Sequence, residues 1–303
     1  MIRTYTAHLP GLLPVYTTTG RKGQSAFAIL APSEQGVTTA PYRPTDEERS
    51  RLLRLYARPA FGGLRALAVS FESDPAILRA LLPPPLEPAT RPLVRIDIHH
   101  VARPNCLGPF FGAGVNIACQ YQGQQGNFCL AMPMSTEAAV LFGRELYGEP
   151  KKLARISLER RGREASGVVE RHGITYIELR ATLTEEAPPP ATAEWLQFYF
   201  KYLPSPDGRG FDLGPELVQV RHTGPVRRLE RGRGEVILRE SPHDPVAALP
   251  VRKVLGAAWS EGDTYTEGQV LCQVDPEAFL PYMFFKSDDW GLLAAEAQAG
   301  DSH

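Results

Sequence analysis

Apolar and polar residues alternate along much of the chain, and this two-residue period predicts a protein built mainly from β-strands. The clearest case is the segment LVRIDIHHV, residues 93–101. Val94, Ile96 and Ile98 fall on one face, whereas Arg95, Asp97 and His99 fall on the opposite face. A polar strand face usually meets solvent, but in a barrel it can line the interior instead.

Similar runs predict a series of further strands. They cover residues 64–71, 114–121, 127–134, 154–160, 164–170, 174–183, 195–203, 215–222, 234–240 and 269–274. The segment QGQQG at 122–126 predicts the turn of one antiparallel hairpin, and residues 171–173 predict the turn of another. Proline-rich segments at 186–194 and 203–210 are predicted to be loops.

Three segments have helical character instead. They are residues 47–56, the segment SDPAILRALLPPP at 73–85, and residues 135–146. In the second segment Ser73 is the predicted N-cap and the triple proline ends the helix. Many antiparallel strands with a few inserted helices predict an α+β fold with a curved or barrel-like sheet. We expect one main domain at 61–303, with residues 1–60 packed on it as an N-terminal extension.

Composition narrows the class of protein. The 303-residue chain is 43% hydrophobic and 22% charged, with a formal net charge of −1, which is typical of a globular protein. This balance offers no basic surface for nucleic acid, and no apolar run reaches the roughly 18 residues of a membrane-spanning helix. The four cysteines lack the spacing of a zinc site or a disulfide framework. We therefore expect free thiols, no metal, no membrane partner and a cytoplasmic protein.

The segment GRELYGEPKKLA, residues 143–154, sets two lysines at a fixed point of the backbone. The preceding helix is predicted to end at Gly148, and Pro150 then holds the chain extended. A lysine amine attacks a carbonyl carbon only when it is unprotonated, and burial or a neighbouring cation lowers the pKa of an amine. Lys151 is the candidate nucleophile and Lys152 the cation that would modulate it, although a strand would turn the two side chains to opposite faces.

The sequence GRELYGEPKKL resembles the active-site segment of the acetoacetate decarboxylase family, in which the first lysine forms a Schiff base with a ketone. The resemblance extends upstream through FESDPAILRALLPPPLE, RPLVRIDIHHV and LGPFFGAG, and covers roughly residues 62–160. It implies the fold of that family, a covalent imine through Lys151 without any cofactor, and a homo-oligomer.

The chain departs from the family pattern at three positions. The family's two glutamates fall on Asp97, which keeps a carboxylate, and on Gly112, which has no side chain. The family's arginine falls on Leu64, and Arg65 is a substitute one place along. We expect Gly112 to open space beside the imine and to change which groups move protons.

Several residues are candidates for the work of the missing carboxylate. Tyr147 and Glu149 precede the lysine closely and are candidates to transfer a proton or to orient a substrate carboxylate. Phe110 is a candidate for the apolar wall of the site, and Tyr282 and Trp290 are candidates to reach it from the C-terminal third.

The resemblance implies an enzyme acting on a small 2-oxo acid or ketone. Because Gly112 removes a carboxylate, aldol condensation and dehydration with an aldehyde co-substrate is the favoured reaction, of the aldolase–dehydratase type. Decarboxylation of a β-keto acid such as acetoacetate is the alternative, with Asp97 and water replacing the family carboxylates. A non-catalytic protein that binds a small molecule is the alternative from another class.

Overall fold

The computed structural model describes residues 43–287. The chain divides into two compact units, residues 1–48 and 49–303, and the strands of the described residues lie in the second unit. Positions 1–42 of the expected N-terminal extension lie outside the described residues, so the extension remains a prediction. Within the described part, no helix is long and apolar enough to cross a membrane.

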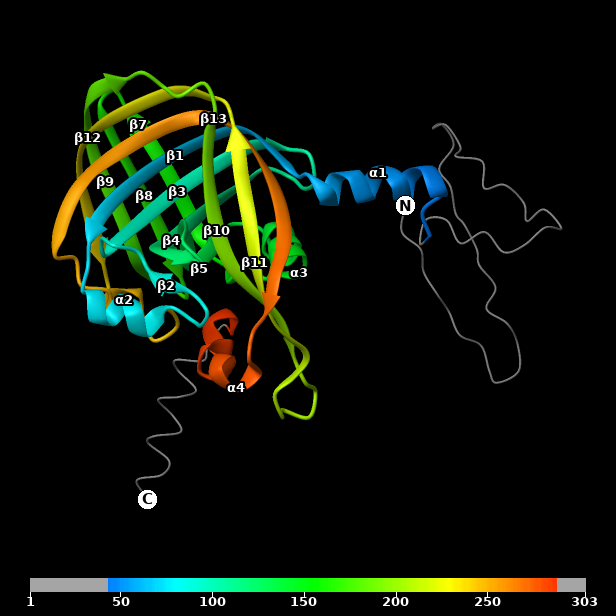
Figure 1. Cartoon of the computed structure of the whole chain (residues 1–303). Helices are drawn as coiled ribbons and strands as arrows, with labels where there is room; N and C mark the ends of the chain where they lie inside the picture. Colours follow the sequence, from blue (N-terminus) through cyan, green and yellow to red (C-terminus); the bar gives the residue numbers. More distant parts are fainter. Residues whose placement is uncertain (1–42, 288–303) are drawn as a thin grey trace, which may run out of the picture. The chain divides into compact units, whose positions relative to one another are not determined.

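The described residues contain thirteen strands that join in one sheet, with short helices between them (Figure 1). The strands are β1 (Ala60–Glu72), β2 (Glu87–Pro88), β3 (Leu93–Pro104), β4 (Phe110–Tyr121), β5 (Gln124–Met134), β6 (Lys151–Leu153), β7 (Arg155–Arg161), β8 (Glu164–Arg171), β9 (Ile174–Ala187), β10 (Ala193–Pro204), β11 (Phe211–Gly224), β12 (Val226–Leu238) and β13 (Lys253–Gln273). The α-helices are α1 (Asp46–Ala57), α2 (Pro75–Leu81), α3 (Glu137–Tyr147) and α4 (Pro276–Phe279), and the 3₁₀ helices are η1 (Val246–Ala248) and η2 (Leu280–Lys286).

The sheet closes on itself. Its strand order is β1-β3-β4-β5-β10-β11-β13-β12-β9-β8-β7, with β2 beside β4 and β6 beside β5. Because β1 also pairs with β13, the first seven strands of this order form a closed ring. The remaining four strands leave the ring at β13 and pack against β1, β3 and β4, behind which Figure 1 shows them. The sheet therefore encloses an interior and carries a second layer on its outside.

The long strand β13 joins the ring to the outer layer. Residues 253–265 pair with β1 along one edge, while on the other edge residues 257–262 pair with β12 and 265–273 pair with β11. The alternation pattern predicted only residues 269–274 of this strand, because glycines and acidic residues interrupt the pattern before that point.

Strand β3 shows why the two faces of the ring differ. Val94, Ile96 and Ile98 are fully buried in the core between the ring and the outer layer, where Ile98 lies against Gly167 of β8. The polar residues that alternate with them line the interior of the ring. The predicted alternation is thus confirmed, and the polar face meets an enclosed cavity rather than the outer surface.

The predicted α+β class, the curved sheet and both hairpin turns are confirmed. Gln122 and Gly123, between β4 and β5, have φ values of 50° and 81°. His172 and Gly173, between β8 and β9, have φ values of 49° and 79°. Two successive residues with positive φ are typical of the tight turn that matches the twist of an antiparallel hairpin.

The N-cap of α2 differs from the prediction. Asp74, rather than Ser73, accepts hydrogen bonds from the backbone N–H groups of Ala76 and Ile77, at 2.8 and 3.3 Å. Either residue type can cap a helix. Ser73 is instead buried against the core side of the chain.

Helix α3 ends as predicted, and its end fixes where the two lysines begin. Thr136 caps the N-terminus, and Gly148 adopts a left-handed conformation with φ 77° at the C-terminus. A Cβ atom at Gly148 would lie 2.5 Å from the backbone oxygen of Phe200. The helix therefore turns sharply against β10, and Lys151 follows three residues later at the start of β6.

Replacing Gly148 by alanine is expected to destabilise the protein by about 1–3 kcal/mol, because the left-handed backbone strain adds to a collision with Phe200. Gly123→Ala is the matched control, since Gly123 also has positive φ but its Cβ would meet nothing within 4 Å. Urea unfolding of the two variants separates the collision from the strain. Equal losses of unfolding free energy in both would contradict a role for the close contact.

Candidate active site

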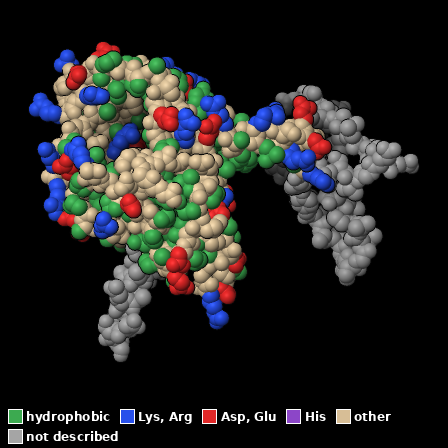
Figure 2. Space-filling model, viewed as in Figure 1, with side chains coloured by type: hydrophobic (Ala, Val, Ile, Leu, Met, Phe, Trp, Pro, Cys, Tyr) green, Lys and Arg blue, Asp and Glu red, His purple; other side chains and the backbone are tan. Residues whose placement is uncertain are grey.

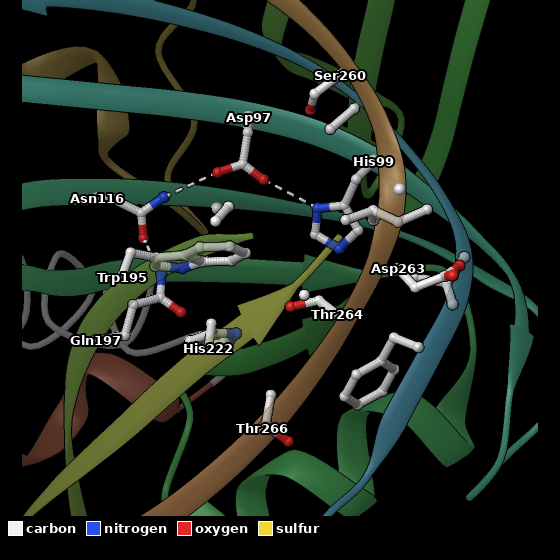
Figure 3. A pocket seen from close by; sticks show the side chains of 18 of the residues that line it. Asp97, His99, Asn116, Trp195, Gln197, His222, Ser260, Asp263, Thr264 and Thr266 are labelled. Carbon is white, nitrogen blue, oxygen red and sulfur yellow. Dashed lines mark hydrogen bonds and ion pairs between the residues drawn. The ribbon is translucent and has the colours of Figure 1, made fainter. Parts of the chain in front are cut away.

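The interior of the ring contains a cavity of about 360 Å³. One part of its wall is apolar and is formed by Phe61, Leu64, Phe110, Met132, Met134 and Trp195. The rest carries ionisable, hydroxyl and amide side chains from several strands, nine of which Figure 3 labels together with Trp195. On the outer face seen in Figure 2, acidic and basic side chains are instead scattered without a patch of one sign. A largely apolar cavity with a few convergent polar groups is the usual form of a small-molecule site.

Lys151 projects into this cavity and is paired there with a carboxylate. Its Nζ lies 2.6 Å from Oε2 of Glu149, and the two side chains are only 9% and 8% exposed. Burial disfavours isolated charges, whereas the carboxylate favours a charged amine. At this distance Glu149 can accept a proton from the amine directly.

Helix α3 leaves room for this ion pair at Gly143. A Cβ atom at Gly143 would overlap both Oε2 of Glu149 and Nζ of Lys151. Glycine inside a helix costs about 1 kcal/mol relative to alanine, so the helix gives up some stability here. In return, the ion pair can lie directly against the helix backbone.

Lys152 points to the other side of β6, as alternation requires. Its Nζ lies 3.0 Å from Oδ1 of Asp244, whose Oδ2 accepts a hydrogen bond from Nε of Arg171 at 2.6 Å. Arg171 also donates to the backbone oxygen of Leu153 at 2.6 Å. This corrects the expectation that Lys152 binds substrate or modulates Lys151. Lys152 belongs to a buried structural cluster, and the charged group that faces Lys151 is an anion.

Asp97 lies in the cavity at the start of a chain of hydrogen bonds (Figure 3). Its Oδ2 is 2.9 Å from Nδ1 of His99, and its Oδ1 accepts from Nδ2 of Asn116 at 3.1 Å. Asn116 in turn accepts from Nε2 of Gln197 at 2.8 Å, and Gln197 accepts from the hydroxyl of Tyr199 at 2.5 Å. Both oxygens of the carboxylate are thus occupied by protein groups.

Asp97 is held in its ionised form. Burial raises the pKa of this carboxyl group, but the hydrogen bond with His99 and the positive charge of Arg95 outweigh burial and leave the pKa below its ordinary value. An ionised carboxylate can only accept, so Nδ1 of His99 carries the proton of their shared hydrogen bond. Asp97 therefore orients His99 and is not free to donate a proton itself.

His222 is an uncharged imidazole in the middle of these groups. Its ring stacks on Trp195 with centroids 4.8 Å apart and an interplanar angle of 8°. Burial lowers the pKa of His222 to about 3, and although Asp97 opposes this shift, the charges of Lys151 and His99 add to it. Its Nε2 is buried and has no hydrogen-bond partner among the described residues. This nitrogen is available to a ligand.

Tyr147 also reaches the cavity. Its hydroxyl lies 3.1 Å from Oγ1 of Thr266, and its ring packs directly on the backbone of Gly268. Burial raises the pKa of Tyr147 to about 12, so the phenol stays protonated at neutral pH. It can donate a hydrogen bond to a substrate oxygen.

Two expected site residues do not have the expected roles. A Cβ at Gly112 would be 2.5 Å from Nε2 of His99 and 2.9 Å from Cε of Met134, so Gly112 does not open space in the cavity. Arg65 is exposed, whereas its neighbour Leu64 lines the cavity, because adjacent residues of a strand face opposite ways. Arg65 therefore cannot replace the family's arginine.

Sequence reasoning missed His99 and His222 as site residues. A signal for His99 was present, because it follows Asp97 by two positions on the same strand face. No local signal marks His222, which reaches the cavity only through the closure of the ring. Tyr282 donates to the backbone oxygen of Ala80 and lies outside this cavity, and Trp290 lies outside the described residues.

The described residues contain no group of three or more His, Cys, Asp and Glu side chains arranged to hold a metal ion. All four cysteines are free thiols, and burial raises the pKa of the Cys106 thiol to about 11.

A sequence profile for acetoacetate decarboxylase matches residues 39–274. The chain belongs to the acetoacetate decarboxylase family. A relative from Lactiplantibacillus plantarum, named CLA biosynthesis isomerase, is 29% identical over 226 residues, which cover 68% of this chain and 80% of that protein. An acetoacetate decarboxylase from Burkholderia multivorans is 30% identical over 200 residues, covering 63% of this chain and 78% of the relative.

The fold of the family is shared with the enduracididine biosynthesis enzyme MppR, solved with the condensation product of pyruvate and imidazole 4-carboxaldehyde. The two structures superpose with a TM-score of 0.59 and 17% sequence identity, over 70% of this chain and 88% of MppR. Members of the acetoacetate decarboxylase family with this fold are enzymes, and an enzymatic role for this chain is supported.

The Lys152 cluster gives a stability prediction. Asp244→Asn removes a buried carboxylate that pairs with two buried cations, Lys152 and Arg171, so a loss of about 3 kcal/mol of unfolding free energy is expected. Glu235→Gln is the control, because Glu235 is 58% exposed and its ion pair with Arg180 spans 3.7 Å. That change is expected to shift stability by less than about 0.5 kcal/mol. Chemical denaturation measures both, and similar small losses would show that the cluster is not structural.

Proposed function

We propose that this protein is a Schiff-base enzyme that condenses a small 2-oxo acid or ketone with an aldehyde and then dehydrates the product. The observation that carries this proposal is the buried amine of Lys151, 2.6 Å from Glu149, inside the cavity of the ring. An amine shielded from water with a proton acceptor beside it has what nucleophilic attack on a carbonyl carbon requires.

The first stage of the reaction follows from this pair. Glu149 takes a proton from Lys151, and the neutral amine attacks the carbonyl carbon of the oxo acid. Loss of water, with a proton supplied to the departing oxygen, leaves an iminium ion on Lys151. The iminium draws electrons from the adjacent carbon, whose deprotonation gives an enamine that adds to the aldehyde. No cofactor takes part in this scheme, because the protonated imine is itself the electron sink.

In this scheme, uncharged side chains of the cavity orient the substrate. The protonated phenol of Tyr147 and the unpartnered Nε2 of His222 are both placed to hydrogen-bond a carboxylate or carbonyl oxygen. Arg95, which lines the same cavity, supplies a positive charge that favours an anionic substrate.

The size of the cavity favours two reactants. Its 360 Å³ is about twelve times the volume that one water molecule occupies in the liquid. A four-carbon oxo acid has only seven non-hydrogen atoms and would leave much of this space empty. An aldehyde partner with an apolar substituent would fill the remainder, against the wall formed by residues such as Phe110 and Trp195.

Decarboxylation of a β-keto acid is the second candidate, and the 30% identity to a decarboxylase from Burkholderia multivorans favours it. It uses the same iminium on Lys151 as electron sink, with CO₂ rather than a proton leaving the adjacent carbon. The fold does not decide between these reactions, since relatives with it carry names of different activities.

Borohydride trapping tests the shared first step. Incubation with pyruvate or acetoacetate and borohydride is expected to add the reduced substrate to Lys151, as located by peptide mass spectrometry. Lys151→Arg abolishes the adduct, whereas Lys253→Arg, which removes a surface amine, leaves it unchanged. A wild-type protein that gives no adduct with any member of an oxo-acid panel would leave only the non-catalytic binding role.

Product analysis then separates the two reactions. An absorbing α,β-unsaturated product that forms only when pyruvate and an aldehyde are both present is expected. Rapid CO₂ release from acetoacetate, lost in Lys151→Arg, would instead establish decarboxylation.

Gly143→Ala tests the ion pair without removing either charge. The added methyl group would occupy the space of the Glu149 carboxylate and the Lys151 amine, so the trapping rate is expected to fall about 100-fold. Alanine favours the helix itself, so the melting temperature serves to show that the fold is intact. Leu141→Ala, on an exposed position of the same helix, is the control. An unchanged trapping rate in Gly143→Ala would refute the importance of this geometry.

A further inference from the structure

We propose that His99 is the group that moves protons at the carbon next to the imine, with Asp97 as its positioning residue. This inference rests on the proposed Schiff-base function and assigns to it a catalytic residue. It makes the part of the cavity next to Nε2 of His99 the place where carbon–hydrogen bonds are broken and formed.

The position of the His99 ring is the first support. Phe110 and Gly114 line the cavity, and Gly112 lies between them on the same face of β4. Nε2 of His99 lies 2.5 Å from where a Cβ of Gly112 would be. The absence of a side chain at Gly112 is therefore what allows this nitrogen to lie over β4, on the cavity side.

The second support is the way the ring is held. Nδ1 of His99 donates to Oδ2 of Asp97 at 2.9 Å, and Asn116 holds the other oxygen of that carboxylate. Figure 3 shows Asp97 between His99 and Asn116, with the second ring nitrogen of His99 on the far side from Asp97. A carboxylate bound to one nitrogen of an imidazole fixes the tautomer and leaves the other nitrogen as the proton acceptor.

The third support is the distance to the amine. His99 pairs with Gly112, Gly112 pairs with Met134, and Lys151 pairs with Met132 two residues along. Three strand spacings, about 14 Å across the sheet, and an offset of two residues along it separate the backbones of His99 and Lys151. Both side chains line the same cavity, so they face one ligand space.

The other ionisable groups of the cavity are less suited to the task. Glu149 is engaged with Lys151, and the phenol of Tyr147, with a pKa of about 12, is a poor base at neutral pH. His222 has a pKa of about 3 and cannot carry a proton to an oxygen at neutral pH. His99 is the imidazole that has both a carboxylate partner and a nitrogen facing the cavity.

The chemical steps balance with His99 alone. Nε2 takes a proton from the carbon next to the iminium, and the C–H electron pair forms the enamine C=C bond while the C=N pair returns to nitrogen. The enamine carbon then attacks the aldehyde carbon, and the imidazolium gives its proton to the aldehyde oxygen. Nε2 next removes a second proton from the carbon next to the re-formed iminium, which gives an enamine again. The enamine electron pair forms the new C=C bond and expels the hydroxyl group, which leaves as water with this proton.

Hydrogen exchange of the substrate separates this role from imine formation. In D₂O, the methyl protons of pyruvate are expected to exchange in the presence of the wild-type protein, as followed by proton NMR. His99→Gln is expected to slow the exchange about 10²- to 10⁴-fold, while borohydride still traps pyruvate on Lys151. His100→Gln, the next residue but on the opposite strand face, leaves both measurements unchanged.

A double variant tests whether another proton acceptor can restore hydrogen exchange. Gly112→Glu alone is expected to lose exchange, because the new side chain collides with the His99 ring. Combined with His99→Ala, it places a carboxylate in the vacated space, and exchange is expected to recover at least tenfold relative to His99→Ala alone. Asp97→Asn is expected to keep the adduct and to shift the pH profile of exchange, which a purely structural role would not do.

Each result has a separate meaning. Exchange at the wild-type rate in His99→Gln, with the adduct intact, would overturn the role of His99 and leave the Schiff-base proposal standing. Loss of the adduct together with exchange would also overturn it, since His99 would then serve imine formation or folding. Absence of any adduct on the wild-type protein would overturn the Schiff-base proposal and this inference together.

Discussion

The pairing of β1 with β13 is the constraint on which the rest of the structure depends. It gives β1 a partner on each edge and converts a curved sheet into a ring with an inside. A carboxylate and an amine in water interact with only about 1 kcal/mol, but inside a closed cavity the same pair is strongly coupled and costly to desolvate. The apolar core between the ring and the outer layer provides the stability that offsets this cost.

Alternation along short strands assigns neighbouring residues to different tasks. On β3 the apolar side chains build the core and the polar ones line the cavity. On β6, Lys152 is fastened to Asp244 outside the cavity, and this anchoring fixes the backbone from which Lys151 extends. Two adjacent lysines that look equivalent in the sequence thus serve different ends, one positioning the strand and the other facing the substrate space.

Local patterns allowed much of the fold to be predicted. The β3 alternation, the hairpin turns and the helix stop at Gly148 depend on neighbours in the sequence, and they are confirmed. The first half of β13 escaped prediction because partners on both edges, rather than its own composition, make it a strand. The same long-range closure brings His222 to the cavity, which is why no nearby motif marks it.

Two glycines show that an absent side chain can be as informative as a reactive one. Gly143 and Gly112 each lie where a Cβ would displace a polar group, the ion pair in one case and the His99 ring in the other. At Gly112 the family pattern has a glutamate, whereas here the His99 ring lies in the space of that side chain. An imidazole in place of a carboxylate also changes the charge of the site. An imidazole, unlike a further carboxylate, adds no negative charge beside Asp97 and Glu149, so under the proposed function an anionic oxo acid would meet less repulsion as it approaches Lys151. The condensation that we propose needs a proton removed at carbon and then delivered to oxygen, and the second ring nitrogen of His99 is the group that we propose for both transfers.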